Sequence, residues 1–468
     1  MRRGRLSDLF LRMGAWLRAA RRRKVSRQAG FALLMATLTT AILGGVVGEF
    51  SYNTRVELES ATNARDQLRA EYLARSGINL SRLLIKVQQS VLDKNRQFTG
   101  DLQLSDFAPY LIKAFGGDKD EREGLSALIG VDASSIKGLG VGKGASFDVE
   151  MGSEDGKINV NCGGGLNAAG NTGNAFNGQP NQLPNQQQGG APPITNPAQA
   201  LYTLLTAVEF PTRYNRLFEN PDSEGQYATR DDIARAVLDW SDVDEQRFEP
   251  LGPSSAGEDY RYDAQRDNYR AHNNYFDTTD EMRLVRGVGD EFWGVFGGYF
   301  TVYGSCKVNL NAVKADDWPI RAAILRAAAK NPQDPVLLDE TKVAALAQQI
   351  GSAAQLFGGL QSVDQFASVA SGNPLGGANQ NGAPPTGGGN SGTPLAGVDL
   401  DTARLRQLAT VGPRQVYRLD ATGTIERPGQ KKIQVRIRAV FDTQHFNQNI
   451  VSSDPNDRAG TWVYWRME

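Results

Sequence analysis

The chain has 468 residues, with 51 Lys and Arg against 52 Asp and Glu, and a formal net charge of −1. This length suggests more than one domain. Because the N-terminal segment is strongly basic, the remainder is acidic, which argues against nucleic acid as a partner and leaves carboxylates available for cations. His272 and His445 are the only histidines, which argues against a histidine-based zinc site or catalytic triad.

The N-terminus carries a basic leader, residues 1–30, that ends at Gly30 and precedes an apolar segment beginning at Phe31. An ordinary secretory signal places its small cleavage residue after the apolar core, whereas Gly30 comes before it. Cleavage between Gly30 and Phe31 would therefore leave the apolar segment on the mature protein. This arrangement resembles the class III signals of the type IV pilin superfamily, which a prepilin peptidase removes. The alternative is an ordinary signal peptide or signal anchor, for which later glycines offer cleavage points.

Residues 31–95 are expected to form one long helix, because they contain no proline and few glycines after Gly48. Apolar residues such as Leu58, Ala61 and Leu68 recur at three- and four-residue steps, which is typical of an amphipathic helix. The apolar start is near the lower limit for a membrane span, and the basic leader would stay in the cytoplasm. The pattern predicts a transmembrane segment that continues into a stalk. A membrane-anchored coiled coil is the alternative, although the stripe is too irregular for sustained heptads.

The remaining residues are expected to form an α+β head. Alternating side chains predict strands at 146–151 and 157–161, joined as a hairpin, and further strands near the C-terminus that close the same sheet. Two segments rich in Gly, Asn and Pro bury too little apolar surface to become ordered. The expected parts are the first part of the head (96–162), an inserted helical domain (163–305, with a flexible loop at 163–197), a strand (306–316), a second helical subdomain (317–371), a linker (372–394) and a β-rich C-terminal part (395–468).

The segment 157–161 (K-I-N-V-N) nearly repeats as 307–311 (K-V-N-L-N), and the two copies bracket the helical insert. Chance similarity of two short strands is the alternative explanation. Cys162 and Cys306 lie at the two ends of the insert. Since an even pair of cysteines in an exported chain most often forms a disulfide, we expect a bridge that clamps the insert. Metal binding by two thiolates alone is a weaker interpretation.

Closely spaced carboxylates follow a predicted helix at Asp239, Asp242 and Asp244, with Glu258 further on. Hard cations such as calcium require several oxygen ligands, and the alternate spacing of Asp242 and Asp244 would point two oxygens at one ion. Asp239 could instead serve only its neighbour Trp240. Carboxylates at a helix C-terminus are disfavoured by the dipole unless something compensates them. The alternative is a solvated acidic loop, and the segment does not match an EF-hand.

Four motifs succeed one another in the insert, namely 239–244 (D-W-S-D-V-D), 257–262 (G-E-D-Y-R-Y), 273–277 (N-N-Y-F-D) and 280–288 (D-E-M-R-L-V-R-G-V). Most pilins have glutamate at the fifth mature position, which is Met35 here. Together with the two K-x-N-x-N segments and the leader, these features resemble the general secretion pathway protein K family of the type II secretion system. The resemblance covers most of the mature chain except the two Gly/Asn-rich linkers.

The resemblance implies a pilin-like long N-terminal helix packed on an antiparallel β-sheet, with a large, mainly α-helical inserted domain. It implies a structural subunit rather than an enzyme: a minor pseudopilin, N-terminally methylated, with one inner-membrane anchor and a periplasmic head. Such a subunit would initiate or cap the pseudopilus tip, with minor pseudopilins I and J and the major pseudopilin as partners. The family also binds calcium, and the residues that correspond here are Asp239, Asp242, Asp244, Glu258 and Asp259.

Two other interpretations remain at the level of sequence. A minor pilin of a type IV pilus, or of a related machine, would share the anchor but act at the cell surface. A membrane-anchored periplasmic enzyme would use the acidic cluster for chemistry. The sequence contains no nucleophile elbow, zinc signature or phosphate-binding loop, which disfavours the enzyme.

Overall fold

The structure is a computed structural model that describes residues 27–100, 102–116, 144–164, 194–219, 227–250, 256–258, 262, 269–356, 358–372, 397–429, 431–443 and 460–468. The basic leader up to residue 26, Asp259, and most of the two Gly/Asn-rich segments lie outside the described residues. The chain divides into two compact units, Met1–Arg69 and Ala70–Glu468. Each unit is described by itself.

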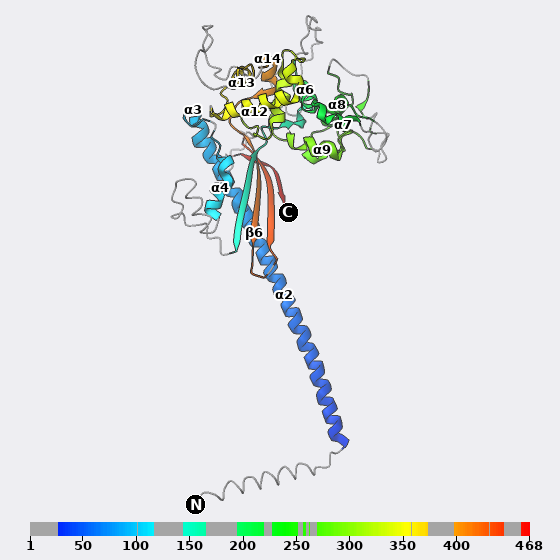
Figure 1. The fold of residues 1–468 in the computed structure, drawn as a ribbon. Coiled ribbons are helices and arrows are strands. Elements are labelled where there is room, and N and C mark those ends of the chain that lie inside the picture. Colours follow the sequence, from blue (N-terminus) through cyan, green and yellow to red (C-terminus); the bar gives the residue numbers. More distant parts are fainter. Residues whose placement is uncertain are drawn as a thin grey trace, which may run out of the picture. The chain divides into compact units, whose positions relative to one another are not determined.

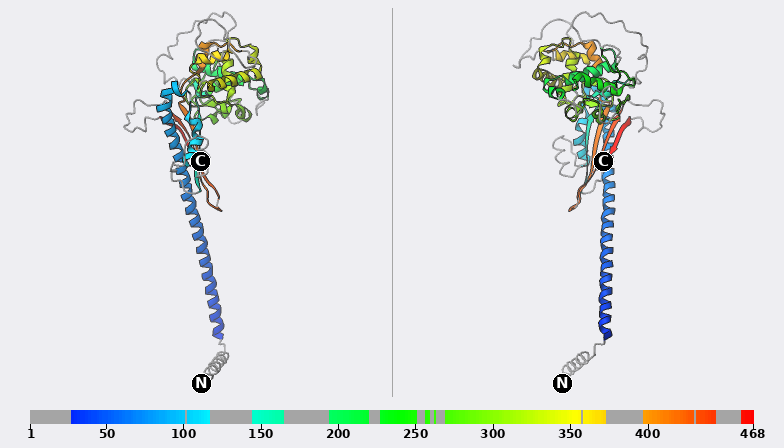
Figure 2. Two further views of the ribbon diagram at one scale, coloured as in Figure 1. Left: turned by 60° about the vertical axis from the view of Figure 1, so that its left-hand side comes forward. Right: turned by 90° about the vertical axis from the view of Figure 1, so that its right-hand side faces the viewer.

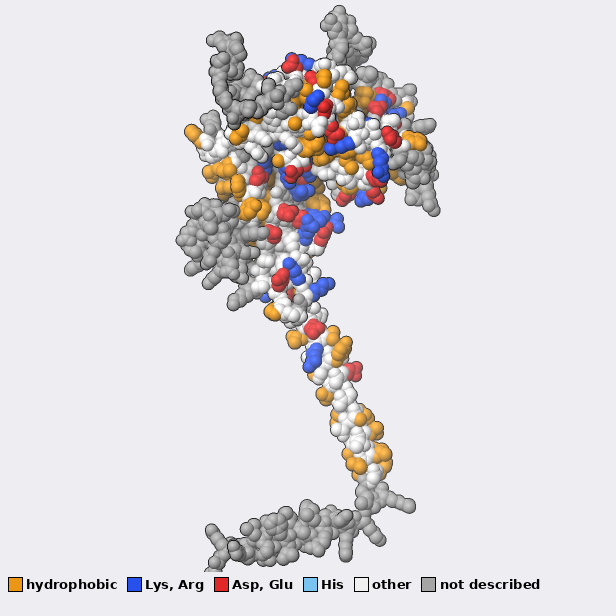
Figure 3. Space-filling model, in the orientation of Figure 1, with side chains coloured by type: hydrophobic (Ala, Val, Ile, Leu, Met, Phe, Trp, Pro, Cys, Tyr) orange, Lys and Arg blue, Asp and Glu red, His pale blue; other side chains and the backbone are white. Residues whose placement is uncertain are grey.

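Helix α2 (Arg27–Val87) is the long N-terminal helix that the sequence predicts. Of the helices that the structure describes, it is the one long and apolar enough to cross a membrane. Hydrophobic side chains cover its described start (Figure 3), and Phe31 is 65% exposed. The hydroxyl groups of Thr37 and Thr39 donate to Leu34 O and Met35 O, both at 2.9 Å. Since these polar groups are satisfied within the helix, they do not prevent it from entering a bilayer.

The second unit contains a four-stranded antiparallel sheet in the order β1-β6-β7-β8 (Figure 1). Ala145 lies opposite Ile425, which in turn lies opposite Ile433, so the three strands are in continuous register. This confirms the prediction that C-terminal strands complete a sheet begun before the insert. The strands are β1 (Ala145–Ser153), β6 (Val416–Ile425), β7 (Ile433–Asp442) and β8 (Thr461–Met467).

The part of α2 that belongs to the second unit runs along one face of this sheet (Figure 2). Ala74, Ile78 and Ile85 are buried there against apolar residues of the strands. The helix comes so close that a Cβ atom at Gly423 would lie 1.9 Å from Ala70 O, so this position requires glycine. After α2 the chain continues through η1 (Gln88–Leu92), η2 (Asp93–Asn95), α3 (Arg96–Thr99) and α4 (Leu104–Gly116), which lies against β1.

A second hydrophobic core belongs to the helical region, and its buried residues extend in sequence from Ile158 to Ala409. Both helical parts expected from the sequence pack around this one core. It also includes α14, so the assignment of 395–468 to a β-rich part is wrong at its start. The elements are α6 (Pro197–Glu209), η6 (Thr212–Tyr214), α7 (Asn215–Glu219), α8 (Arg230–Ser241), η8 (Thr279–Leu284), α9 (Asp290–Phe296), η9 (Gly297–Tyr299), α10 (Trp318–Ala328), α11 (Pro335–Leu338), α12 (Glu340–Leu356), α13 (Val363–Ala370) and α14 (Thr402–Leu408).

Two short parallel ladders belong to the helical region rather than to the large sheet. Strand β2 (Ile158–Asn159) pairs with β3 (Phe300–Thr301), and β4 (Val308–Asn309) pairs with β5 (Ala409–Thr410). Strand β2 is followed by the short helix η4 (Val160–Cys162). We call residues 157–304 the first half of the helical region and residues 307–412 the second half, since each begins with a K-x-N-x-N segment and ends near its parallel partner strand.

These ladders correct two expectations. The predicted hairpin between 146–151 and 157–161 is wrong, because β1 pairs with β6 and β2 pairs with β3. The turn between them is instead held toward the start of β6, where Glu154 N donates to Val416 O at 3.0 Å. The strand expected in 306–316 is present as β4, but its partner is β5 and it does not join the large sheet.

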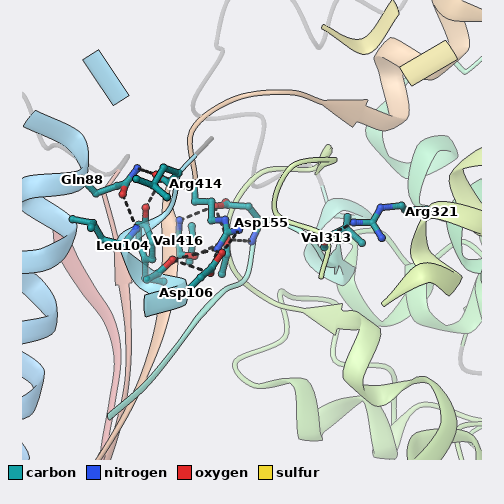
Figure 4. Close-up of polar contacts among 12 residues, drawn as sticks. Gln88, Leu104, Asp106, Asp155, Val313, Arg321, Arg414 and Val416 are labelled. Atoms are coloured by element: carbon teal, nitrogen blue, oxygen red, sulfur yellow. Dashed lines mark hydrogen bonds and ion pairs between the residues drawn. The ribbon is translucent and has the colours of Figure 1, made fainter. Parts of the chain in front are cut away.

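Buried Asp155 connects the sheet to the helical region (Figure 4). Its Oδ2 atom accepts from Gln415 N at 2.6 Å and Val416 N at 3.0 Å. Its own carbonyl oxygen accepts from Asn309 N at 2.8 Å. Burial raises the pKa of Asp155, although the two backbone donors act against that shift. Through its side chain and its carbonyl group together, Asp155 therefore fixes the end of β1, the start of β6 and the second K-x-N-x-N segment to one another.

Cys162 and Cys306 form a disulfide, with Cα atoms 5.5 Å apart and a sequence separation of 144. Cys162 directly follows the first K-x-N-x-N segment, and Cys306 directly precedes the second. The bond therefore closes the first half of the helical region at its two ends.

Candidate metal centre

Helix α8 positions the carboxylates that the sequence singles out. Its N-terminus is fixed by a capping box, in which Thr229 Oγ1 accepts from Asp232 N at 3.1 Å and Thr229 N donates to Asp232 Oδ2 at 3.2 Å. Asp239 lies in the last turn and is buried, and Asp242 is the C-cap residue, with its N–H donating to Leu238 O at 3.0 Å. Because they are three positions apart, Asp239 and Asp242 share one face of this helix end.

Glu258 reaches the same place from a different segment. Arg247 N donates to Ala256 O at 3.0 Å, and Gln246 and Gly257 form an antiparallel bridge. This short ribbon returns the chain to the end of α8. Asp239, Asp242 and Glu258 each offer one oxygen there, and these oxygens all lie within 4.8 Å of one another. We call these three residues the carboxylate cluster.

The cluster holds oxygens that have no donor among the described residues. Asp242 Oδ1 and both side-chain oxygens of Glu258 are buried with no donor in the described part of the chain, apart from a proton that these two carboxyl groups could share, and Glu258 is only 6% exposed. Asp239 differs, since its Oδ1 accepts from Phe248 N at 2.6 Å. Buried carboxylate oxygens are normally satisfied because leaving them bare is costly. The cluster therefore has the donor set that a cation would complete.

The raised pKa values of the three carboxyl groups point the same way. Burial, as the largest cause, raises the pKa of Asp239 to about 7, of Asp242 to about 8 and of Glu258 to about 9. The neighbouring carboxylates raise the pKa values of Asp242 and Glu258 further. Three carboxyl groups this close cannot all ionise near neutral pH unless a positive charge compensates them.

A cavity of about 40 Å³ adjoins the cluster, and its lining includes Asp239 and Glu258 together with Asp232, Tyr262 and two arginines, Arg247 and Arg286. A single water needs only about 10–15 Å³ on this measure, so an ion with a water ligand fits. Arg247 does not neutralise the cluster fully, since its Nη2 is 2.9 Å from Asp232 Oδ1. Oxygen donors, a net negative charge and available space suit a hard cation such as calcium, which Asp239, Asp242 and Glu258 would hold.

The structure brings together part of the predicted ligand set. Asp239, which the sequence alone places least firmly, is a member of the cluster. Asp244 is not, although its charge acts on all three members. Its Oδ1 accepts from Gln246 N at 2.8 Å, so it shapes the turn that carries Asp242. Asp259 lies outside the described residues, and so does most of the leader that precedes the predicted cleavage point at Gly30 and Phe31.

Sequence reasoning did not assign a role to the segment 272–277 that lies against this turn. Asn273 Nδ2 donates to Asp244 O at 3.1 Å, and Asn274 N donates to Trp240 O at 3.4 Å. The N-N-Y-F-D motif was visible in the sequence, but nothing in its spacing relates it to residues some thirty positions earlier.

Comparison with known proteins gives two findings. Residues 181–305 match the model of the family described as type II secretion system (T2SS), protein K. A chain of the crystal structure of the GspK-GspI-GspJ complex from the enterotoxigenic Escherichia coli type 2 secretion system is similar at 16% sequence identity, with 69% of this chain and 80% of that chain covered and a TM-score of 0.39. No curated protein matches the chain.

Proposed function

We propose that this chain, whose residues 181–305 match the model of the type II secretion system protein K family, is a structural subunit at the tip of the pseudopilus, where it initiates or caps assembly. The match over 181–305 is the observation that carries the proposal, because those residues form most of the first half of the helical region. Protein K is a family of pseudopilin components and not of enzymes, so the carboxylate cluster is read as a structural site.

The N-terminal helix supports the anchoring role. Its apolar start is long enough to span a membrane, and a leader cut between Gly30 and Phe31 by a prepilin peptidase would leave that start on the mature subunit. The head would then lie in the periplasm, on the far side of the inner membrane from the basic leader. N-terminal sequencing of the mature chain tests this step, with Phe31 expected as the first residue.

The tip position is supported by two features of this chain. Met35 stands where a carboxylate would pair with the terminal amine of the subunit ahead, so this subunit does not need a partner above it. The helical region is bulky, and its core is separate from the sheet core. Bulk of this kind fits better at the end of a fibre than within its packed shaft.

The proposed partners are minor pseudopilins I and J, with the major pseudopilin below them. The detergent-solubilised mature chain should form a complex of defined mass with candidate I and J subunits, measured by light scattering. Reintroducing the carboxylate through Met35→Glu should shift the subunit toward positions within the fibre. A secretion assay then separates the proposals, since a tip subunit is required for export whereas a pilin of a surface fibre is not.

The carboxylate cluster is proposed as a calcium site that stabilises the first half. A cation that binds the folded state alone adds about 2.7 kcal/mol at a hundredfold excess over its Kd. Calcium should therefore raise the melting temperature of the full chain and a chelator should lower it. Terbium offers a direct reading, because Trp240 lies next to Asp239 and can sensitise its emission.

Matched variants decide whether the effect arises at the cluster. Asp242→Asn and Glu258→Gln should abolish the calcium response, whereas Asp364→Asn, which removes an exposed carboxylate paired with Arg406 in the second half, should preserve it. Without calcium, Asp242→Asn should be more stable than the unsubstituted chain, because it relieves repulsion with Asp239 and Glu258. Identical melting with calcium and with chelator would contradict the calcium site and leave the pseudopilin assignment standing.

A further inference from the structure

Glu281, in η8, makes an unusual set of contacts close to the proposed cation site. Its Oε1 atom accepts from Trp240 Nε1 at 3.1 Å, and His272 Nδ1 lies 3.0 Å from the same oxygen. Its Oε2 atom accepts from Asp277 N at 2.9 Å. One carboxylate therefore joins the last turn of α8 to both ends of the segment 272–277.

Trp240 links Glu281 directly to the carboxylate cluster, because it is hydrogen-bonded to Glu281 and is the sequence neighbour of Asp239. It lies between Asp239 and Ser241, is only 3% exposed, and packs against Tyr262 and Phe276 with ring centroids 5.8 and 6.3 Å away. A shift of the Trp240 ring would turn the end of α8 that carries Asp239 and Asp242. Fixing the indole nitrogen therefore fixes the direction of two members of the cluster.

The segment 272–277 transmits the other contact. Asn273 Nδ2 donates to Asp244 O, and the backbone of Asn273 has a φ of +50°. Among the described residues, it is the non-glycine residue whose backbone lies in the left-handed region. Its Oδ1 atom is buried with no partner in the described part of the chain. Such a conformation persists only when the surroundings enforce it. Here Glu281 contacts both ends of the segment, and Asn161 Oδ1 adds a further contact by accepting from Phe276 N at 2.6 Å.

We infer that Glu281 is a positioning residue of the cation site: it holds Trp240 and the segment 272–277 in the arrangement that aims Asp242 and Asp239 at one ion. Glu281 does not belong to the carboxylate cluster, so its effect passes through the hydrogen bonds of Trp240, Asp277 and Asn273. The inference rests on the cation site proposed above. It predicts that affinity for calcium depends on a carboxylate that does not bind the ion.

The test compares calcium affinity in Glu281→Ala, Glu281→Gln and the unsubstituted full chain in detergent, by titration calorimetry and by terbium emission sensitised through Trp240. Partners that orient metal ligands typically contribute about 10- to 100-fold in affinity, so Glu281→Ala should weaken calcium binding by about that factor. Glu281→Gln keeps one accepting oxygen and should show a smaller loss. Glu340→Gln, which alters a carboxylate paired with Arg213, serves as the matched control and should bind like the unsubstituted chain.

A purely structural role would give a different result. It would lower the melting temperature of Glu281→Ala equally with and without calcium and leave the affinity unchanged. A calcium affinity of Glu281→Ala and Glu281→Gln within twofold of the unsubstituted chain would overturn the inference and leave the cation site intact. Absence of calcium binding by the unsubstituted chain would overturn both, and Glu281→Gln decides the matter if Glu281→Ala fails to fold.

Discussion

The first half of the helical region, residues 157–304, and the second half, residues 307–412, start and finish on equivalent contacts. Asn159 Nδ2 donates to Gly304 O at 2.9 Å, and Asn309 Nδ2 donates to Gly412 O at 3.0 Å. Each of these asparagines also caps its own segment by accepting from the N–H two residues later. The two K-x-N-x-N segments therefore make equivalent hydrogen bonds, which makes chance similarity a poor explanation of the repeat.

The second asparagine of each segment strengthens this equivalence. The Asn161 side chain donates to Phe276 O and accepts from Phe276 N, and the Asn311 side chain donates to Leu360 O and accepts from Leu360 N. We call each such pair of hydrogen bonds a clamp. Each clamp ties the start of its half to a loop more than forty residues later.

The differences between the halves are as informative as the shared contacts. Among the described residues, the carboxylate cluster belongs to the first half alone, and so does the chain segment closed by the disulfide. Since the second half folds on equivalent contacts without such a cluster, the architecture does not require one. This difference supports the proposal that the cluster serves cation binding rather than the fold.

Reducing the Cys162–Cys306 bond should produce the largest effect and fall mainly on the first half. Opening a loop of this length costs about 4–5 kcal/mol in the chain-entropy model. The urea midpoint of the full chain should drop, and hydrogen exchange should accelerate in α6, α8 and the β2–β3 ladder more than in α10 and α12. The variant Cys162→Ser with Cys306→Ser should behave like the reduced chain and ignore reductant. Equal loss of protection in both halves would contradict the assignment of the bond to the first half.

Removing the two clamps in turn should sharpen the comparison with a smaller effect. Asn161→Ala loses contacts to Phe276 and also to Val302 O at 3.1 Å, whereas Asn311→Ala loses only those to Leu360. Leaving buried backbone groups unpaired costs about 1–3 kcal/mol. Urea unfolding should therefore place Asn161→Ala near the upper end of that range and Asn311→Ala lower.

The exposed residue Asn331 supplies a control for this pair, because Asn331→Ala should stay within about 0.5 kcal/mol of the unsubstituted chain. A larger loss for Asn311→Ala than for Asn161→Ala would show that the halves do not depend on their clamps in the way the contacts indicate.

Local sequence signals predicted those helices and strands that have a periodic pattern of apolar residues. Helix α2 follows from a proline-free stretch with an apolar stripe, and β7 follows from alternation of apolar and polar side chains over residues 433–441. The partner of β2 could not be found in this way. Its ladder with β3 is two residues long and joins Ile158 to Phe300, so it leaves no periodic pattern in the sequence.

In the candidate site, too, local sequence signals could identify some of the residues, but not those brought in by distant contacts. The sequence favoured Asp242 with Asp244, yet the structure groups Asp242 with Asp239 and Glu258. The three-residue spacing of Asp239 and Asp242 on a helix was a local signal that could have ranked them first. Glu258 joins them because the antiparallel bridge between Gln246 and Gly257 returns the chain to the end of α8. No local sequence pattern predicts that contact.

The smallest expected effect comes from Glu209, a buried ionisable residue of the first half, which contrasts with a buried arginine of the second half. In the second half, buried Arg321 donates to Val313 O and Lys314 O (Figure 4). In the first half, Glu209 is fully buried, and its side-chain oxygens have no donor in the described part of the chain. Arg230 Nε is bonded to the Glu209 carbonyl instead, at 2.7 Å. Burial raises the pKa of Glu209 well above its ordinary value, against the influence of Arg230.

The sign of the pH dependence follows from that shift. Above the ordinary glutamate pKa the unfolded chain releases the Glu209 proton, while the folded chain keeps it. Stability should therefore fall as pH rises, by about 1.4 kcal/mol per pH unit from this one group, until the pH passes the folded-state pKa. Glu209→Gln cannot ionise, so its urea midpoint should decline less steeply between pH 5 and 6 than that of the unsubstituted chain. Because all other titrating groups are common to both proteins, parallel curves would mean that Glu209 is not buried as an acid.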